Sequence, residues 1–223
     1  MTVTALLFDL DGTFADTAPD LANALNQLLQ AEGRPPLPFE RIRPYVSQGS
    51  PGMLKVGFQL TSNDTEFARL KEEFLAIYQR QLCIQTRLFD GIQTTLEWLE
   101  HKQMIWGIVT NKPDYLTQPL IRQLKLPQAP AVVISGDTCK EKKPHPMPLL
   151  EACKRLAIAP EQCIYVGDDR RDIQAAKAAL MKSISAEWGY IAPNQDPAQW
   201  QADQRLTHAS QLVAAVTAFC EKD

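Results

Sequence analysis

Short apolar runs alternate along most of the chain with stretches in which apolar residues recur every three or four positions. The runs cover residues 5–8, 105–109, 131–134 and 163–166, with a weaker one at 183–186. Runs that are nearly continuous in apolar residues are typical of strands buried on both faces. The helical spacing predicts helices over 92–102, 147–157 and 170–180, and a last helix is expected at about 209–220. This alternation predicts an α/β fold with a parallel sheet.

The gap between the first two runs is too long for one crossover helix. Thr17 can cap a helix that has Pro19 in its first turn, and a leucine stripe over 21–29 follows. A second apolar stripe lies over 67–78, and Ser-Gln-Gly-Ser-Pro-Gly at 47–52 predicts a flexible turn between the two. The sequence therefore predicts a Rossmann-like, doubly wound core of residues 1–16 and 86–223 and an inserted small helical cap domain of residues 17–85.

The amino-acid composition indicates a globular protein and argues against nucleic-acid and membrane partners. With 45% apolar and 22% charged residues among 223, the chain has the balance of a globular protein. Its 23 Lys and Arg residues are outnumbered by 26 Asp and Glu, so no nucleic-acid partner is expected. No apolar run approaches the roughly 20 residues of a membrane span, and the first residues lack the basic start of a signal peptide. The five cysteines, an odd number without a Cys-x-x-Cys pair, favour free thiols in a reducing cytoplasm.

Polar residues follow the first four strand-like runs. They are Asp9 and Asp11 after the first run, Thr110, Asn111 and Lys112 after the second, Ser135 and Asp137 after the third, and Asp168, Asp169 and Asp172 after the fourth. The carboxyl ends of parallel strands share one edge of a sheet, where open α/β folds bind their ligands. The sequence therefore predicts one site to which four strand ends contribute.

The acids of this site predict a metal ion. Up to four carboxylates come close together at the edge, and their mutual repulsion needs protons or a cation to offset it. They belong to Asp9, Asp11, Asp168 and Asp172. Oxygen ligands without a nearby His or Cys suit Mg²⁺, which is commonly bound together with a phosphate.

The same edge holds the groups that a phosphoryl transfer needs. Lys143, or its neighbour Lys142, can place a cation against the phosphoryl oxygens, and Thr110 offers a hydroxyl donor. Asp9 is a candidate nucleophile because a carboxylate can form an aspartyl-phosphate. Asp11 can protonate the leaving oxygen and then deprotonate the attacking water.

Four motifs in this order resemble those of the haloacid dehalogenase superfamily of phosphohydrolases. They are Asp9-Leu-Asp-Gly-Thr13, Thr110, Lys143-Pro144 and Gly167-Asp-Asp-Arg-Arg-Asp172, and the resemblance covers almost the whole chain. It implies a Rossmann-like core, a helical cap inserted after the first strand, and Mg²⁺-dependent hydrolysis through an aspartyl-phosphate.

The resemblance also implies a role for each acid of the motifs. Asp9 is the expected nucleophile and metal ligand. Asp11 is the expected acid and base, and its backbone carbonyl binds the metal. Asp168 is expected to bind the metal, and Asp172 to support it directly or through water. Asp169 stands where many relatives carry Ser and receives no role.

Further residues are expected to hold the substrate. The resemblance implies that Thr110 and Lys143 hold the phosphoryl oxygens, and that Asp137 steadies the lysine. The residues expected to bind the substrate besides these are Gly12 and Thr13 of the first motif, Asn111 next to Thr110, and Arg43 of the cap.

The type of reaction follows from particular positions. Asp11 favours an oxygen-linked phosphate, because members of the superfamily that act on other bonds lack an acid there. The three histidines lie outside residues 17–85, which favours hydrolysis over a mutase that places a His in its cap. Arg43 and the polar residues over 47–50 suit a small acidic or hydroxylated ester.

Two branches of the family are similar to this chain. The chain as a whole resembles the phosphoglycolate phosphatases, and 2-phosphoglycolate is the expected substrate. Several stretches, among them 73–80, 106–113 and 167–173, look like N-acetylmuramate 6-phosphate phosphatases, and that ester is the alternative. A receiver-type signalling module with a phosphorylated aspartate is the alternative of another class, although receivers are about half this length. A monomer and a homodimer are both compatible with the sequence.

Overall fold

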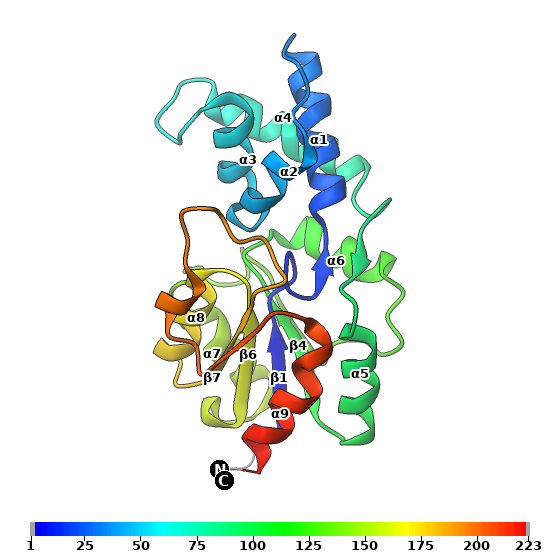
Figure 1. Ribbon diagram of the computed structural model, residues 1–223, viewed down its shortest axis with the longest axis vertical. Helices are drawn as coiled ribbons and strands as arrows, with labels where there is room; N and C mark the ends of the chain where they lie inside the picture. Colours follow the sequence, from blue (N-terminus) through cyan, green and yellow to red (C-terminus); the bar gives the residue numbers. More distant parts are fainter. Residues whose placement is uncertain (1–2, 222–223) are drawn as a thin grey trace.

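The computed structural model describes residues 3–221 and has a parallel sheet of six strands at its centre (Figure 1). The strands lie in the order β5-β4-β1-β6-β7-β8. Their bounds are Ala5–Phe8 (β1), Ile105–Val109 (β4), Val132–Ile134 (β5), Cys163–Gly167 (β6), Lys182–Ala186 (β7) and Gln204–Leu206 (β8). The predicted α/β class and the five predicted strands are confirmed. β8 lies outside the predictions because Leu206 is its only buried apolar residue.

Helices cover both faces of this sheet. They are α5 (Ile92–His101), α6 (Asp114–Gln123), α7 (Met147–Leu156), α8 (Arg170–Ala178) and α9 (Leu212–Cys220), with short 3₁₀ segments η2 (Pro160–Gln162), η3 (Pro197–Trp200) and η4 (Ala209–Gln211). Alternate side chains of β1 point to opposite faces of the sheet. Leu6 and Phe8 belong to the apolar core that includes α5 and α9, whereas Ala5 and Leu7 belong to the one with α7 and α8. α6 lies outside the predictions, and Pro119 sits within it.

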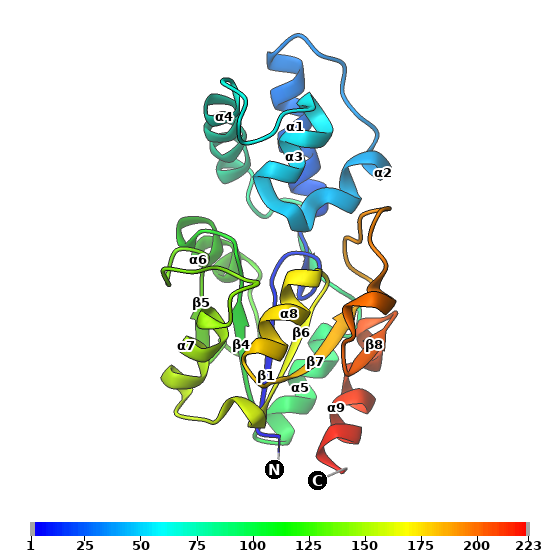
Figure 2. The ribbon, with the colours of Figure 1, turned by 90° about the vertical axis from the view of Figure 1, so that its left-hand side faces the viewer.

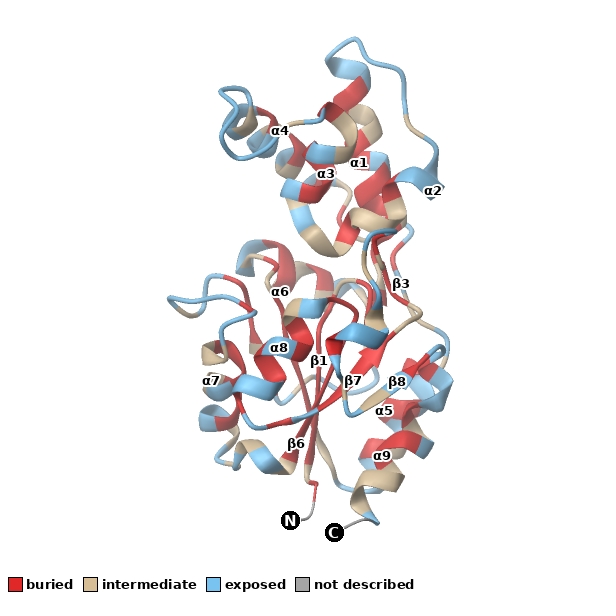
Figure 3. Ribbon diagram, turned by 60° about the vertical axis from the view of Figure 1, so that its left-hand side comes forward, coloured by how far each residue is buried: buried red, intermediate tan, exposed pale blue. Residues whose placement is uncertain are grey.

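A helical unit lies above the carboxyl end of the sheet (Figures 1 and 2). It consists of α1 (Ala18–Ala31), α2 (Phe39–Ile42), η1 (Arg43–Gln48), α3 (Gly49–Phe58) and α4 (Phe67–Arg80). Figure 3 shows its buried residues on the sides of the helices that face one another. We call this unit the cap.

Two local predictions for the cap are wrong. Residues 47–52 are not a flexible turn, because η1 runs to Gln48 and α3 begins at Gly49. Gly49 makes the change of direction with a φ of +65°, and Pro51 is well suited to the first turn of a helix. Thr17 does stand at the start of α1, but its hydroxyl donates to Asp11 (2.6 Å) and not to the helix.

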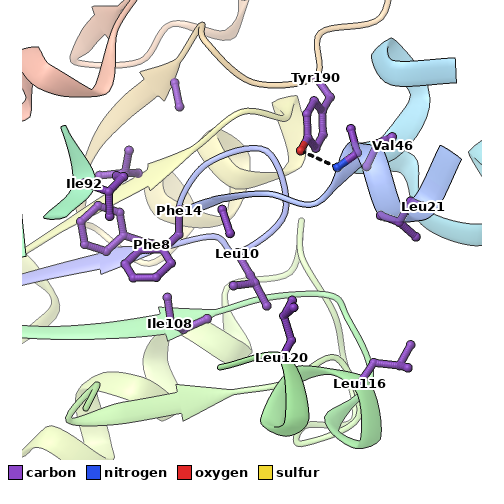
Figure 4. Packing of buried hydrophobic residues seen from close by; sticks show 14 of the residues in the cluster. Phe8, Leu10, Phe14, Leu21, Val46, Ile92, Ile108, Leu116, Leu120 and Tyr190 are labelled. Atoms are coloured by element: carbon purple, nitrogen blue, oxygen red, sulfur yellow. Dashed lines mark hydrogen bonds between the residues drawn. The ribbon is translucent and has the colours of Figure 1, made fainter. Parts of the chain in front are cut away.

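A small antiparallel sheet joins the two segments that connect core and cap. It pairs β2 (Ala15–Asp16) with β3 (Arg87–Leu88). The hydroxyl of Tyr190 lies beside it, accepting from the backbone N–H of Ala18 (2.9 Å, Figure 4) and donating to Asp16 (2.6 Å). The two connecting segments are therefore paired with each other, and Tyr190 binds the first of them to the loop after β7.

Aromatic packing fills the core below this junction. Phe14 stacks on Trp106 with ring centroids 5.4 Å apart, and it meets Phe8 edge to face at 5.5 Å (Figure 4). All three side chains are buried. Phe14 therefore anchors the loop that carries the first acidic motif.

Asp20 supplies a stability test for the junction. Its buried carboxylate accepts from the backbone N–H of Gln85 and Thr86 (3.0 and 2.9 Å) and from the Thr86 hydroxyl (2.7 Å). Asp20→Ala is expected to lower the free energy of unfolding by about 2–3 kcal/mol, because buried donors lose a charged acceptor. Asp20→Asn, which keeps one acceptor oxygen, should cost less. Urea unfolding of the three proteins checks this, and equal stabilities of Asp20→Ala and the native chain would contradict it.

Candidate active site

The ends of three neighbouring strands bring together the predicted polar residues. β1 pairs with β4 on one side and β6 on the other, so Asp9 lies between Thr110 and Asp168. A cavity of about 290 Å³ separates this edge from the cap. Of the residues predicted for the site, those that line the cavity are Asp9, Asp11, Thr110, Asn111, Lys143 and Asp172. A cavity that two units share above a sheet edge is a common position for an active site.

Three of the acids form one buried cluster. Asp9, Asp168 and Asp172 each offer a carboxylate oxygen, and these oxygens lie within 4.8 Å of one another. The start of α8 places the third acid, because Asp169 caps this helix and Asp172 stands in its first turn. The backbone N–H of Asp169 donates to Asp172 (3.0 Å), which fixes that carboxylate. Asp169 thus has a structural role that the sequence does not indicate.

Asp168 is the most deeply buried acid of the cluster. Thr13 donates to one of its oxygens (3.1 Å), while Ser47 (2.6 Å) and the backbone N–H of Tyr190 (2.8 Å) donate to the other. Burial, together with the charges of the neighbouring acids, raises the pKa of Asp168 well above its usual value. The carboxylate lies against Gly12, where a Cβ would come within 2.1 Å of an Asp168 oxygen, so the position needs glycine.

Lys143 supplies a buried cation to the cluster. Its ammonium contacts Asp9 (3.0 Å) and Asp172 (2.7 Å) and also donates to the Tyr165 hydroxyl (2.8 Å). Burial disfavours the charged lysine, but Asp172 and Asp9 outweigh it and raise the pKa of Lys143. Burial also raises the pKa of Asp172 to about 7, against the opposing effect of Lys143. The side chain of Asn111 binds the backbone N–H and C=O of Lys143 (both 3.0 Å).

The composition of the cluster fits a divalent metal ion. Three carboxylates face one ammonium group, so negative charge is left uncompensated in a buried place. All donors are oxygens, which is the set that Mg²⁺ binds. The residues present therefore fit the ion that the sequence predicts, with Asp9, Asp168 and Asp172 as the side-chain ligands.

Asp11 stands apart from this cluster and has its own partners. It accepts hydrogen bonds from Thr17 (2.6 Å) and Lys112 (3.0 Å), and Lys112 in turn donates to the hydroxyl of Tyr78 (3.0 Å). Burial disfavours charge on Lys112, but Asp11 and Tyr78 outweigh it and raise the pKa of this lysine. Asp11 is thus a carboxylate held at the cavity by contacts from both core and cap.

Of the four further residues predicted to contact the substrate, three do not line the cavity, namely Gly12, Thr13 and Arg43. Thr13 instead donates a hydrogen bond to Asp168, and Gly12 lies against the carboxylate of Asp168. The guanidinium of Arg43 donates to the backbone carbonyls of residues 188 and 189 (both 3.0 Å) and lies over the ring of Tyr190. Asn111 lines the cavity, but its amide is occupied by the backbone of Lys143. These side chains have partners within the protein, which the sequence does not reveal.

The acid expected to steady the lysine also lies elsewhere. Asp137 accepts from the backbone N–H of Asp114 (2.9 Å) at the start of α6. The contacts of the Lys143 ammonium within residues 3–221 do not include it. This expectation is wrong because Asp172, in the first turn of α8, occupies the place beside the lysine.

The cap contributes cavity residues that the sequence leaves unassigned. One face of α4 presents Lys71, Phe74, Leu75 and Tyr78, spaced three and four residues apart. The other apolar residues there are Leu21 and Val46 of the cap and Leu116 of α6 (Figure 4). The cation Arg171 lines the cavity from α8 and binds Asp169 and the backbone carbonyl of Ser47. A contact with the cap fixes the position of the Arg171 side chain. The pattern of residues within α8 therefore does not predict that Arg171 lines the cavity.

A parallel α/β core, a helical insertion after its first strand and an acid cluster at the strand ends together define a class of hydrolase. A sequence profile described as haloacid dehalogenase-like hydrolase matches residues 6–186, and the chain belongs to this family. The family expected from the four motifs is confirmed.

Individual relatives cover nearly the whole chain. A phosphoglycolate phosphatase of Xanthomonas campestris pv. campestris is 48% identical over 208 residues, which are 93% of this chain and 94% of the relative. An N-acetylmuramic acid 6-phosphate phosphatase of Pseudomonas aeruginosa is 37% identical over 222 residues, 99% and 98% of the two chains. The crystal structure of a predicted phosphoglycolate phosphatase from Haemophilus somnus 129PT matches with a TM-score of 0.84 at 27% identity, covering 96% of this chain and 98% of that one.

Within residues 3–221, no helix combines the length and the apolar character that crossing a membrane requires.

Proposed function

We propose that this chain hydrolyses small phosphate monoesters with Mg²⁺ through an aspartyl-phosphate on Asp9. The observation that carries the proposal is the position of Asp9, which lines the cavity and contacts Lys143 within the buried acid cluster. An ammonium group and a metal ion beside a carboxylate offset its repulsion of a dianionic phosphate. The carboxylate can then approach the phosphorus atom. Release of inorganic phosphate over many turnovers tests the proposal, and a single phosphorylation without turnover would favour a receiver module.

The proposed reaction has two steps. A carboxylate oxygen of Asp9 attacks phosphorus, the bond to the ester oxygen breaks, and Asp11, which enters this step in its protonated form, gives that oxygen its proton. Water then attacks the phosphoryl group on Asp9, Asp11 takes the proton of that water, and inorganic phosphate leaves. Thr110 and Lys143 hold the phosphoryl oxygens, since both line the cavity beside Asp9.

The metal would add a divalent cation to the site, beside the ammonium group of Lys143. Asp9, Asp168, Asp172 and the backbone carbonyl of Asp11 would hold Mg²⁺, which neutralises charge on the phosphoryl oxygens when it is bound. Removing it with excess EDTA is expected to lower kcat at least about 100-fold. Added Mg²⁺ should restore the rate, whereas Ca²⁺ should inhibit, because its longer bonds allow Asp9 to bind bidentate. Full activity in excess EDTA would contradict the metal role.

We further propose that residues 17–85 act as a cap domain that closes over the leaving group. The support is the shared cavity, to which α1, η1, α3 and α4 all contribute residues. Enclosure excludes water that would otherwise weaken the electrostatic contacts, and it lets the cap select the ester. From its composition we also propose a cytoplasmic enzyme with a small-molecule phosphate ester as its partner.

The substrate we place first is 2-phosphoglycolate. Its support is the 48% identity to a phosphoglycolate phosphatase. N-acetylmuramic acid 6-phosphate is the second candidate, because a phosphatase named for this ester aligns over 99% of this chain. The cavity of about 290 Å³, with apolar residues in its walls, also has room for a sugar. Values of kcat/KM for the two esters, measured side by side, decide between them. A strong rate only on a nucleotide or a simple hexose phosphate would contradict both.

Lys71 is the cap cation that we expect to contact the carboxylate of either ester. It lines the cavity, and within residues 3–221 its ammonium has no ion-pair or hydrogen-bond partner, whereas Arg43 has bonds to the core. Lys71→Met should raise KM for the acidic esters about tenfold and change kcat little, because a charged hydrogen bond is lost.

A substrate comparison controls for indirect effects of this change. Lys71→Met should leave KM unchanged for a simple alkyl phosphate, which has no carboxylate. Equal increases of KM for the acidic and the alkyl ester would show that Lys71 does not bind the carboxylate.

A further inference from the structure

A cap hydroxyl reaches the most buried acid of the core. Ser47, in η1, donates to one oxygen of Asp168 at 2.6 Å. Within residues 3–221, the other two donors to this carboxylate are Thr13 and the backbone N–H of Tyr190, and both come from the core. One of the three hydrogen bonds on Asp168 therefore exists only while the cap is in its present position.

The backbone of the same residue is also held by a hydrogen bond from the core. Arg171 donates from Nη2 to the carbonyl oxygen of Ser47 (2.7 Å) and to Asp169 (3.0 Å), and from Nε to the other oxygen of Asp169 (2.8 Å). Arg171 belongs to the first turn of α8, the turn that also places Asp172. In Figure 2, α8 lies directly beneath the cap. Ser47 is thus bound by its side chain and by its backbone to two parts of the acid cluster's framework.

A third contact holds the beginning of η1. Arg43, its first residue, donates to the backbone carbonyls of Trp188 and Gly189, and the next residue along, Tyr190, donates its N–H to Asp168. Both ends of η1 are therefore bound to segments that also contact Asp168 or Asp172. A shift of the carboxylates in the acid cluster would therefore act on η1 through these direct contacts.

We propose that Ser47 is a positioning residue that couples Mg²⁺ binding at the acid cluster to closure of the cap. Hydrogen bonds to a metal-binding carboxylate fix its orientation and strengthen metal binding. If the closed cap improves Mg²⁺ binding through Ser47, the bound ion stabilises the closed cap by the same factor. The inference rests on the Mg²⁺ site of the proposed function and adds a role that the reaction itself does not require.

Mg²⁺ binding without substrate tests the first half of the coupling. Titration calorimetry compares the native chain with Ser47→Ala and with Ser50→Ala, a matched change in the same cavity at a serine without a contact to Asp168. Ser47→Ala should bind Mg²⁺ about tenfold more weakly, and Ser50→Ala like the native chain. Unchanged or tighter binding by Ser47→Ala would overturn the proposal, since the hydroxyl would then be idle or compete with the ion.

Hydrogen exchange tests the second half. Mg²⁺ should slow amide exchange over residues 43–52 in the native chain and in Ser50→Ala, but not in Ser47→Ala. Ser47→Thr keeps the hydroxyl and should recover the slowing. Equal slowing in Ser47→Ala would overturn the coupling. A native chain that binds no Mg²⁺ contradicts the proposed function itself, whereas one that binds it equally well without the Ser47 hydroxyl contradicts only this inference.

Discussion

Asp9→Asn is expected to lower kcat at least about 1,000-fold, because an amide does not attack phosphorus and no longer offsets the metal charge. The change preserves size, and the bond from the backbone N–H of Leu10 (2.7 Å) can still find an oxygen acceptor. The variant should therefore fold like the native chain. Steady-state phosphate release with 2-phosphoglycolate, at saturating Mg²⁺, measures the loss.

Asp169→Asn is the matched control for this experiment. Asp169 also lines the cavity, but its carboxylate caps α8 and binds Arg171. Asparagine is a good helix cap, so most of the activity should remain. An Asp9→Asn variant that kept more than about a tenth of native kcat would show that Asp9 is not the nucleophile.

Asp11→Asn is expected to lower kcat by about 100- to 10,000-fold, the usual contribution of a general acid and base. The amide cannot take a proton from water, so the second step should slow and the phosphorylated enzyme should accumulate. The bond from Thr17 can remain, which keeps the side chain in place. Rapid-quench measurement of phosphate bound to protein checks this, and a near-native kcat for Asp11→Asn would contradict the assigned role.

The strands and the acids at their ends could be predicted from sequence because their signals are local. A run such as Ala5-Leu-Leu-Phe has no polar position, so it indicates a strand buried on both faces. The topology rule for parallel sheets then places Asp9, Thr110 and Asp168 at one edge. No tertiary contact needs to be known for this step.

Some elements carried weak or misleading local signals. β8 has one buried apolar residue, and α6 contains Pro119. The stretch at 47–52 is rich in Gly and Ser, which predicts a turn. Tertiary packing of α3 against α1 and α4 outweighs that preference, since Met53 and Leu54 are fully buried there.

The orientation of individual site residues could not be predicted, because it depends on partners far along the chain. Its residue type predicts Arg43 as a substrate contact, yet its guanidinium binds carbonyls about 145 positions away. Ser47, Lys112 and Arg171 join the site through contacts between core and cap. A sequence pattern within one helix or strand contains no information on such contacts.

Mass spectrometry of the acid-quenched enzyme tests whether Asp9 carries the phosphoryl group during turnover. The native chain, with Mg²⁺ and 2-phosphoglycolate, is quenched in acid after a few milliseconds, and its peptides are examined by mass spectrometry. The proposed mechanism predicts a phosphoryl group on Asp9, in larger amount for Asp11→Asn and absent from Asp9→Asn. Continuous phosphate release without a phosphorylated Asp9 in either the native chain or Asp11→Asn, or a phosphoryl group on another residue, would contradict it.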